Sequence, residues 1–284
     1  IEIEMAESKA EDDYEPNLVG FAENGDCDFI LAVGGLMGDA LKIVAEEFPD
    51  QRFGIVDANV PLDNVFSMEF DTAQSSFLAG YLAAGMSKTG VVATYGGLEI
   101  PPVTIFMDGY AQGIEYYNEE EDADVKLLGW DYEKQNGSFT GNFDSSDDGQ
   151  SQTETFVSQD ADVIFPVAGG TGVGTPTVTQ DHDDVYSIWV DVDGAVSVPN
   201  YKDQFLSTSV KNMPDAVRDA VVNARDDGPM DGRTVGTLEN EGVSLAPLHE
   251  DVPDELASKL TEIQQMIIDG DIPVVSEAQP DPVE

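Results

Sequence analysis

The chain of 284 residues has little positive charge, with 12 lysines and arginines against 57 aspartates and glutamates and a formal net charge of -45. A field of that sign repels the phosphates of nucleic acids and anionic lipid surfaces, so we expect neither as a partner. The acidic residues are spread over many loops, as in NEEEDADVK and DSSDDGQ. Dispersed acid with so few lysines is typical of halophilic proteins, in which molar salt screens the repulsion.

The sequence also has few cysteines, no long apolar runs and few histidines, and each of these excludes or disfavours a class of protein. The single cysteine, Cys27, excludes an intrachain disulfide, and no apolar run is long enough to span a membrane. The only histidines, His182 and His249, do not stand beside a nucleophile turn such as G-x-S-x-G. Because no residue set argues for catalysis, we expect no enzyme activity and no cofactor.

Two acidic segments have the composition of metal sites. In QDHDDVY the acids are consecutive with His182, so their side chains point in different directions. DSSDDGQ resembles the start of a calcium loop at Asp144, but the twelfth position is Thr155 rather than glutamate. We interpret QDHDDVY as a solvated surface loop, consider the calcium-loop match of DSSDDGQ weak, and expect no metal site.

Strand and helix patterns alternate along the chain in two consecutive series. The first series contains the strand patterns IEIEM, CDFILAVGG, RFGIVDA, VFSMEFD and GVVATYGG, with helices from Asp39 and over 73–88. The second contains the strands VKLLGWD, ADVIFPV, VYSIWVDVD and FLSTSV, with helices over 105–118, 151–159, 213–225 and 252–269. This alternation predicts an α/β protein with two doubly wound lobes and parallel sheets.

The seam between the lobes is placed at GGLEIPP, residues 96–102, where glycine and proline interrupt the pattern. Lobe one is then 1–101 with about 213–228, and lobe two is 102–212 with about 229–284. In doubly wound sheets, ligands bind at the carboxyl ends of the strands. We therefore expect the ligand site in a cleft between the lobes, lined by residues from strand ends.

The segment VAGGTGVGTPTV, Val167–Val178, has four glycines within six positions behind a buried strand pattern. It lacks the lysine of a P-loop and the spacing of a dinucleotide fingerprint, and no basic residue lies between Lys134 and Lys202 to neutralise a phosphate. The pattern favours a turn whose backbone approaches an uncharged ligand. A tight turn with a purely structural role remains the alternative.

A second strand-end pattern pairs acid with one of the few cations. In WVDVDG, Asp191 and Asp193 end a buried strand on the same side, and STSVKN ends another strand at Lys211. A carboxylate and an ammonium at neighbouring strand ends would hold the hydroxyls of a polyol by charge-assisted hydrogen bonds. A plain salt bridge is the alternative interpretation.

Several of these segments stand in an order that resembles a known family. FSMEFDTAQSSFLAGYLAA, KTGVVATYGGLEIPPVTIFMDGYAQG, GSFTGNF, ADVIFPVAGGTGVG, IWVDVDG and STSVKN together are similar to the basic membrane protein family. These are substrate-binding proteins of ABC transporters, of the purine-nucleoside-receptor type. The resemblance covers almost the whole chain. It implies a type I periplasmic-binding-protein fold, lipid-anchored on the outer face of the cell membrane, that closes on a nucleoside and delivers it to a permease.

The resemblance also implies the site residues. The phenylalanine of the GSF turn, Phe139, would stack on the base, while Gly169, Gly170, Asp191 and Lys211 would hold the sugar. The family's M-D-I-P motif stands here as LEIP, which places Glu99 where the family has aspartate. We expect a monomer. Alternative functions are a ligand-sensing module without a transport role and a hydrolase on the same fold.

The beginning of the chain departs from the family. Family members start with a strand and a helix whose Asp, Asn and Ser-Phe-Asn residues contact the base, whereas this sequence starts at what resembles the second strand, IEIEMAESKA. We therefore expect lobe one to lack its first strand and helix and to have an exposed or gapped sheet centre, with signal and anchor lying outside the sequence given.

Overall fold

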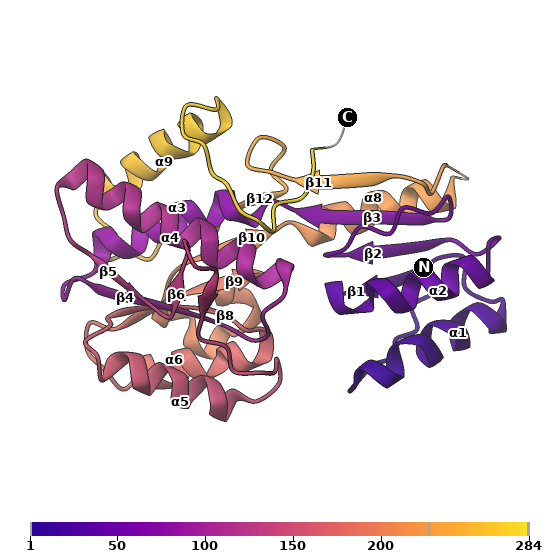
Figure 1. The fold of residues 1–284 in the computed structure, drawn as a ribbon, viewed down its shortest axis with the longest axis horizontal. Helices are drawn as coiled ribbons and strands as arrows, with labels where there is room; N and C mark the ends of the chain where they lie inside the picture. Colours follow the sequence, from indigo (N-terminus) through magenta and orange to yellow (C-terminus); the bar gives the residue numbers. More distant parts are fainter. Residues whose placement is uncertain (1, 227, 283–284) are drawn as a thin grey trace. The chain divides into compact units, whose positions relative to one another are not determined.

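The computed structural model describes residues 2–226 and 228–282, and in it the chain forms two compact α/β units. Unit 1 comprises Ile1–Phe70, Met213–Gly236 and Pro280–Glu284, and unit 2 comprises Asp71–Asn212 and Thr237–Gln279. Each unit contains a mainly parallel sheet with helices packed on it (Figure 1). The α/β class and the two parallel sheets are thus as the sequence predicts.

The sheet of unit 1 has four parallel strands in the order β1-β2-β3-β11. Their bounds are Ile30–Val33, Phe53–Val56, Val65–Phe70 and Arg233–Gly236. Strand β2 is buried along its whole length, which explains its continuous apolar sequence FGIV. Strand β1 pairs with β2 and forms one edge of the sheet.

The helical elements of unit 1 are η1 (Glu11–Asp13), α1 (Tyr14–Asn24), η2 (Gly35–Met37), α2 (Gly38–Glu47) and α8 (Met213–Arg225). Helices α1 and α2 pack on each other and α1 packs against β1, while α8 packs against β3. The buried core between α1, α2 and the sheet includes Leu18, Leu41, Val44, Phe53 and Ile55. Helix α1 ends at Gly25, whose φ of 66° is the left-handed conformation that often terminates helices.

The main sheet of unit 2 has six strands in the order β12-β10-β9-β8-β4-β5, parallel except for β12, which runs antiparallel to β10. Their bounds, in that order, are Val243–Leu245, Phe205–Lys211, Tyr186–Asp191, Val163–Val167, Val91–Gly96 and Lys126–Leu128. A small hairpin of β6 (Trp130–Asp131) and β7 (Asn136–Gly137) follows β5.

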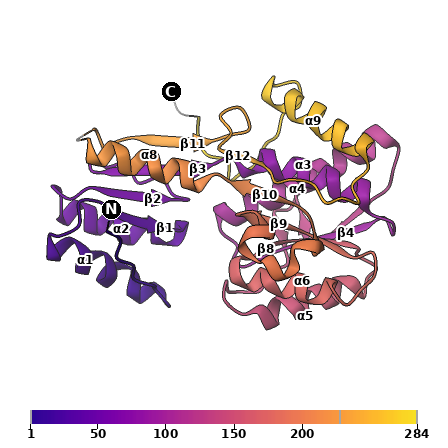
Figure 2. The ribbon, with the colours of Figure 1, turned by 180° about the vertical axis from the view of Figure 1, so that it is seen from behind.

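Helices cover both faces of this sheet (Figures 1 and 2). On one side lie α3 (Thr72–Met86), α4 (Pro101–Glu121) and α9 (Asp254–Ile268), and on the other α5 (Ser146–Val157) and α6 (Gly174–Thr179). The shorter elements are η3 (Gly169–Val173), α7 (Gly194–Ser197) and η4 (Pro199–Gln204). None of the helices in residues 2–226 and 228–282 is long and apolar enough to cross a membrane.

Helices α3 and α4 pack closely because glycines lie at their contact. A Cβ atom at Gly80, Gly109 or Gly113 would collide with a backbone carbonyl oxygen of the opposite helix. Helix α3 is buried on nearly all sides, which explains the broad apolar pattern that predicts it. The two helices therefore form a rigid layer behind the strands that carry the candidate site.

Two expectations about the chain's organisation differ from the structure. Strand β4, residues 91–96, pairs with β5 and β8 in the sheet of unit 2, so the seam does not lie at residues 96–102. Strand β11 pairs with β3 in unit 1, although the sequence assigns residues 229–236 to lobe two. The physical reason is that strand pairing decides membership, and a local sequence pattern does not encode the partner of a strand.

Three predicted or missed elements show the same limitation. Residues 2–5 of the IEIEM pattern form no strand in the structure, and Ile1 lies outside the described residues. The pattern has the period of a strand, but an extended segment without a sheet neighbour gains no ladder hydrogen bonds. VKLLGWD is divided into β5 and β6 at Gly129, where φ is 86°. Helix α1 was not predicted. The expectation of a missing first strand stays a prediction.

Candidate functional site

Four neighbouring strands of unit 2 end at one edge of the sheet, because parallel strands share the direction of their carboxyl ends. Strand β10 ends at Lys211 and β9 at Asp191, while β8 leads into Gly169 and β4 ends at Gly96. The order of these strands is β10-β9-β8-β4. The row therefore spans three strand spacings, roughly 14 Å, and it contains most of the strand-end residues that the sequence singles out.

Lys211 and Asp191 form an ion pair at one end of the row. Lys211 Nζ lies 2.9 Å from Asp191 Oδ1, with the lysine side chain 6% exposed and the aspartate side chain 35% exposed. The parallel register places Val210 beside Asp191, so the two charged residues lie at the ends of adjacent strands. The predicted pair is thus formed within unit 2, and the salt bridge weighed as an alternative exists in the structure.

This pair has two further features. Lys211 Nζ also lies 5.6 Å from the centre of the Phe106 ring, a distance at which the ring face attracts a cation. Asp191 has a φ of 69°, in the left-handed region that costs free energy for residues other than glycine. Six other non-glycine residues among those described share this conformation, so the burial of the Lys211 ammonium is what sets the pair apart.

Phe139 lies at the other end of the row, on the end of β4. Its neighbours hold it there through backbone hydrogen bonds: Gly96 N donates to Ser138 O at 3.0 Å, and Thr140 N donates to Gly96 O at 3.0 Å. A Cβ atom at Gly96 would clash with the Phe139 ring. Gly96 is therefore required for the half-buried ring to lie against the strand end.

A second aromatic ring, Phe143, was not predicted by sequence reasoning. A Cβ atom at Gly97 would collide with this ring, and a Cβ at Gly170 would lie 2.9 Å from the Phe143 carbonyl oxygen. Phe143 O also accepts a hydrogen bond from Thr171 N at 3.1 Å. The Gly96-Gly97 pair at the end of a buried strand pattern was the signal that could have revealed this packing.

The glycines of the loop after β8 occupy their positions for different physical reasons. Gly169 has a φ of 51° and begins η3 together with Gly170, and both residues are exposed. The first backbone N–H groups of a helical turn have no acceptor within the turn, so these amides need an acceptor from outside it. Gly174 is required for close packing, because a Cβ there would collide with the backbone of α5.

Two other strand-end acids do not join the row. Asp193 Oδ1 accepts a hydrogen bond from Ala195 N at 2.9 Å and thereby caps α7. Glu99 is exposed in the turn between β4 and α4. Within the part of the chain that the structure describes, no hydrogen bond or ion pair is found between Glu99 and the other five predicted site residues.

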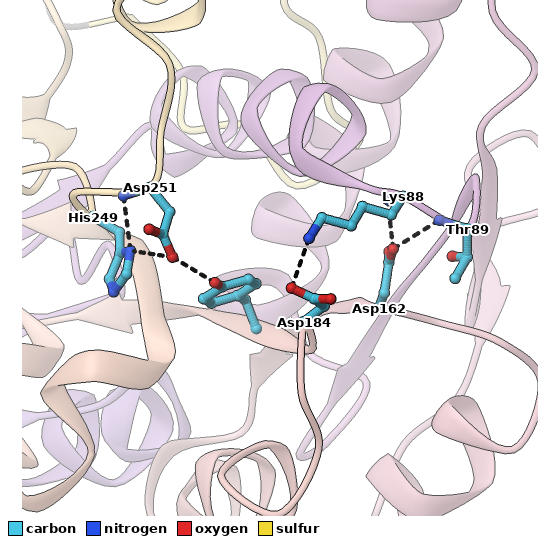
Figure 3. Close-up of polar contacts among 7 residues, drawn as sticks. Lys88, Thr89, Asp162, Asp184, His249 and Asp251 are labelled. Atoms are coloured by element: carbon cyan, nitrogen blue, oxygen red, sulfur yellow. Dashed lines mark hydrogen bonds and ion pairs between the residues drawn. The ribbon is translucent and has the colours of Figure 1, made fainter.

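A second polar cluster lies at the opposite, amino-terminal edge of the same sheet (Figure 3). Asp162, just before β8, accepts hydrogen bonds from Ser87 Oγ at 2.6 Å and from the backbone N–H groups of Lys88 and Thr89 at 2.6 and 2.8 Å. Lys88 Nζ pairs with Asp184 Oδ1 at 2.6 Å, with both side chains mostly exposed. This part of the cluster holds the turn between α3 and β4.

The remaining residues of that cluster also hold a turn. Tyr186 donates its hydroxyl proton to Asp251 Oδ2 at 2.6 Å, and this bond together with burial raises the pKa of Tyr186 to about 12. His249 Nδ1 accepts a hydrogen bond from Asp251 N at 3.2 Å. Among residues 2–226 and 228–282, no group of three His, Cys, Asp or Glu residues could hold a metal ion.

The sequence comparison identifies one family. The family model for PnrA-like ABC transporter substrate-binding proteins (Bmp) matches residues 1–277. The chain is 29% identical to a CD4+ T-cell-stimulating antigen of Listeria monocytogenes over 94% of this chain and 75% of that protein. It is 27% identical to the ABC transporter nucleoside-binding protein BmpA of Lactococcus lactis, over 95% of this chain and 77% of that protein.

One further relative and one solved structure extend the comparison. An uncharacterized lipoprotein of Pyrococcus abyssi is 30% identical over 64% of this chain and 44% of its own length. A solute-binding protein of an ABC transporter system from Aeropyrum pernix superimposes with a TM-score of 0.82 at 23% identity, covering 97% of this chain and 83% of that one.

The structural likeness also includes a LacI-family transcriptional regulator from Enterococcus faecium with bound ribose, at a TM-score of 0.57 and 15% identity. At these identities the superpositions show the fold alone, which is the type I periplasmic-binding-protein fold that the sequence resemblance implied. The family match, by contrast, covers nearly the whole chain. The chain therefore belongs to the Bmp family of PnrA-like ABC transporter substrate-binding proteins, which bind a solute and are not enzymes.

Proposed function

We propose that this protein binds a purine nucleoside and delivers it to the permease of an ABC transporter. The observation that carries the proposal is the row of strand ends in unit 2, which has an aromatic ring at one end and the Lys211–Asp191 ion pair near the other. A flat base and a hydroxylated sugar are the two halves of a nucleoside. The naming of a relative as a nucleoside-binding protein supports the same ligand class.

Each residue has a defined role in this proposal. The face of Phe139 stacks on the base, an interaction worth roughly 1–3 kcal/mol. The carboxylate of Asp191 accepts hydrogen bonds from the ribose hydroxyls, and the ammonium of Lys211 holds that carboxylate in place and donates to a sugar oxygen. The backbone amides of Gly169 and Gly170, at the start of η3, donate to the remaining sugar oxygens. Glu99 lies outside this row, and a contact between it and the base rests on the family resemblance of the LEIP motif alone.

Charge sets the preference for nucleosides over nucleotides. The net charge of -45 creates a negative field that opposes the approach of a phosphate, and the cation in the row, Lys211, is already paired with Asp191. Since a relative in Pyrococcus abyssi is named a lipoprotein, we place this protein on the outer face of the cell membrane with a lipid anchor, where it meets its permease.

Calorimetry tests the proposal directly. The protein should bind adenosine, inosine or guanosine and should bind the corresponding monophosphates far more weakly. Asp191→Ala should reduce nucleoside affinity by about a hundredfold, because it removes the acceptor of two charge-assisted bonds. Asp193→Ala is the matched control, since it alters an acid two residues away that caps α7, and its affinity should stay unchanged. Equal affinities for nucleoside and monophosphate, or full affinity in the Asp191 variant, would contradict the proposal.

A further inference from the structure

A fully buried carboxylate lies behind the proposed site, on helix α4. The side chain of Asp108 is inaccessible to solvent. Its Oδ1 atom accepts hydrogen bonds from Trp130 Nε1 at 3.0 Å and Gln135 Nε2 at 2.8 Å, and its Oδ2 atom accepts one from Ser276 Oγ at 2.5 Å. Within the described residues, Asp108 forms no ion pair with a lysine or arginine. Burial of a carboxylate without a countercharge is costly, so this residue needs an explanation.

The contacts of Asp108 fix the hairpin that leads to Phe139. Trp130 belongs to β6 and pairs with Gly137 of β7, and Gln135 lies in the turn between these strands, where it also donates to Tyr132 O at 2.9 Å. The segment from β7 continues directly into Phe139. Asp108 thus holds one strand and the turn of the hairpin at a single point.

Trp130 transmits this restraint to the proposed stacking ring. The centres of the Trp130 and Phe139 rings lie 6.1 Å apart with an interplanar angle of 87°, which is the favourable edge-to-face arrangement. Trp130 is itself buried, with 6% exposure. Because its indole N–H is held by Asp108 and its edge contacts Phe139, the orientation of one ring limits that of the other.

The same stretch of α4 binds the segment that follows α9. Gln112, one helical turn after Asp108, donates to Val275 O at 2.6 Å and accepts from Val275 N at 3.1 Å. Ser276, the next residue, is the third donor to Asp108. Asp108 therefore joins three parts of unit 2 that are distant in sequence: α4, the hairpin and the segment around residue 276.

We propose that Asp108 is a positioning residue for the nucleoside site: it orients Trp130, and through it Phe139, before the ligand arrives. This inference rests on the proposed function. A ring that is already held in its bound orientation loses less conformational freedom on binding, so the affinity is higher than for a mobile ring. Asp108 does not itself contact the ligand.

Trp130 fluorescence provides a readout that does not depend on any ligand. The chain has two tryptophans, so Trp189→Phe leaves Trp130 as the single reporter. In that background, Asp108→Leu should shift the emission of Trp130 to longer wavelength and increase its quenching by acrylamide, because the indole loses its acceptor and its fixed position. Asp108→Asn should restore both properties, because the amide oxygen still accepts from Trp130 Nε1 and Gln135 Nε2.

Nucleoside affinity, measured by calorimetry, should follow the fluorescence. Asp108→Leu should weaken binding about tenfold, a fraction of what a stacked ring contributes, and Asp108→Asn should stay within about twofold of the unaltered protein. If Asp108→Leu does not fold, Trp130→Phe replaces it: this change keeps an aromatic ring, deletes the N–H donor and should weaken binding to a similar degree.

Asp162→Asn is the matched control, because Asp162 is another buried carboxylate with three donors but lies at the opposite edge of the sheet. It should change neither Trp130 emission nor affinity. Folded Asp108→Leu protein with unchanged emission, or with altered emission and unchanged affinity, would overturn the inference. An Asp108→Asn protein as impaired as the leucine variant would overturn it as well. If the unaltered protein binds no nucleoside, the proposed function fails, while the fluorescence still decides whether Asp108 fixes Trp130.

Discussion

The two edges of the six-stranded sheet in unit 2 differ in which charged side chains are buried. At the amino-terminal edge, the buried carboxylate of Asp162 accepts three hydrogen bonds from one short turn, and the ion pair of Lys88 with Asp184 is exposed to solvent. At the carboxyl-terminal edge, the cation of Lys211 is buried. The acids of the two ion pairs, Asp184 and Asp191, both have a left-handed backbone, so burial of the cation is what distinguishes the edges.

This difference separates charged groups that increase the free energy of unfolding from charged groups whose burial lowers it. A buried carboxylate satisfied by backbone N–H groups stabilises the turn that provides them. A buried ion pair, in contrast, frequently contributes no net stability, because the desolvation of both charges offsets their attraction. The carboxyl edge is therefore the edge at which substitutions should affect binding more than folding.

Asp162→Ala should produce the largest loss of stability among single changes at the two edges. It removes the charged acceptor of two backbone N–H groups, of Lys88 and Thr89, and a hydrogen bond to a charged group contributes about 1.5–3 kcal/mol. We expect the free energy of unfolding to fall by about 3 kcal/mol in urea denaturation. Nucleoside affinity of the folded variant should be unchanged. A stability close to that of the unaltered protein would show that this carboxylate does not hold the turn.

Lys211→Met should show the reverse pattern. The Asp191 side chain that is left without its ammonium is 35% exposed, so water solvates much of its charge, and we expect the free energy of unfolding to fall by about 1–2 kcal/mol, less than for Asp162→Ala. Affinity for a nucleoside should fall by about thirtyfold, or about 2 kcal/mol, since a charge-assisted hydrogen bond to the sugar is lost. Calorimetry and urea denaturation on the same preparation measure the two effects. A variant that loses stability but keeps its affinity would remove the distinction between the edges.

A third carboxylate, Asp71, differs from Asp162 because it is buried but its hydrogen bonding is incomplete. It follows β3, and its Oδ2 atom accepts from Gln74 Nε2 at 2.8 Å and Gln279 Nε2 at 2.7 Å. In the described residues its buried Oδ1 atom has no hydrogen-bond partner. Burial raises the pKa of Asp71 above its ordinary value of 3.8, and the two amides only partly oppose this.

The raised pKa of Asp71 gives a pH dependence with a definite sign. Between the ordinary pKa and the raised one, the folded protein binds more protons at this group than the unfolded chain, so the free energy of unfolding falls as the pH rises. Asp71→Asn removes this contribution. Melting temperatures measured from about pH 4 to 8 should therefore decline less with pH in the variant, whose relative stability is greatest at the high end. Parallel curves for the two proteins would contradict the assignment.

The sequence predicts the inner strands of both units well because their apolar runs are buried on both faces, as in FGIV of β2 in unit 1 and VIFPV of β8 in unit 2. The sequence also predicts that Asp191 and Lys211 lie close together, because each residue ends a buried apolar strand. It does not predict which sheet a strand joins: β4 was placed with the first lobe, although it pairs with β8. Local period and composition carry no information about the partner of a strand.

The contacts of Asp108 and Phe143 could not be predicted from the sequence either, because local sequence patterns do not identify partners that are distant along the chain. Asp108 interrupts the apolar pattern of α4, and its three donors lie 22, 27 and 168 residues away in the sequence. From the sequence alone, an aspartate in a helix is predicted to be exposed to solvent, and only the identity of its donors shows that it can be buried. The packing of Phe143 on Gly97 was missed although the glycine pair was visible, because a missing side chain does not say which ring fills its space.

The smallest expected effect concerns the backbone of Asp191. With φ at 69°, aspartate is in a conformation that glycine adopts without steric cost. Asp191→Gly should therefore be more stable than Asp191→Ala by about 1 kcal/mol in urea denaturation, because alanine retains the Cβ that disfavours this region. Neither variant has a carboxylate, so both should have lost nucleoside affinity to the same degree. If the alanine variant is as stable as the glycine variant, the left-handed backbone at this strand end is not strained.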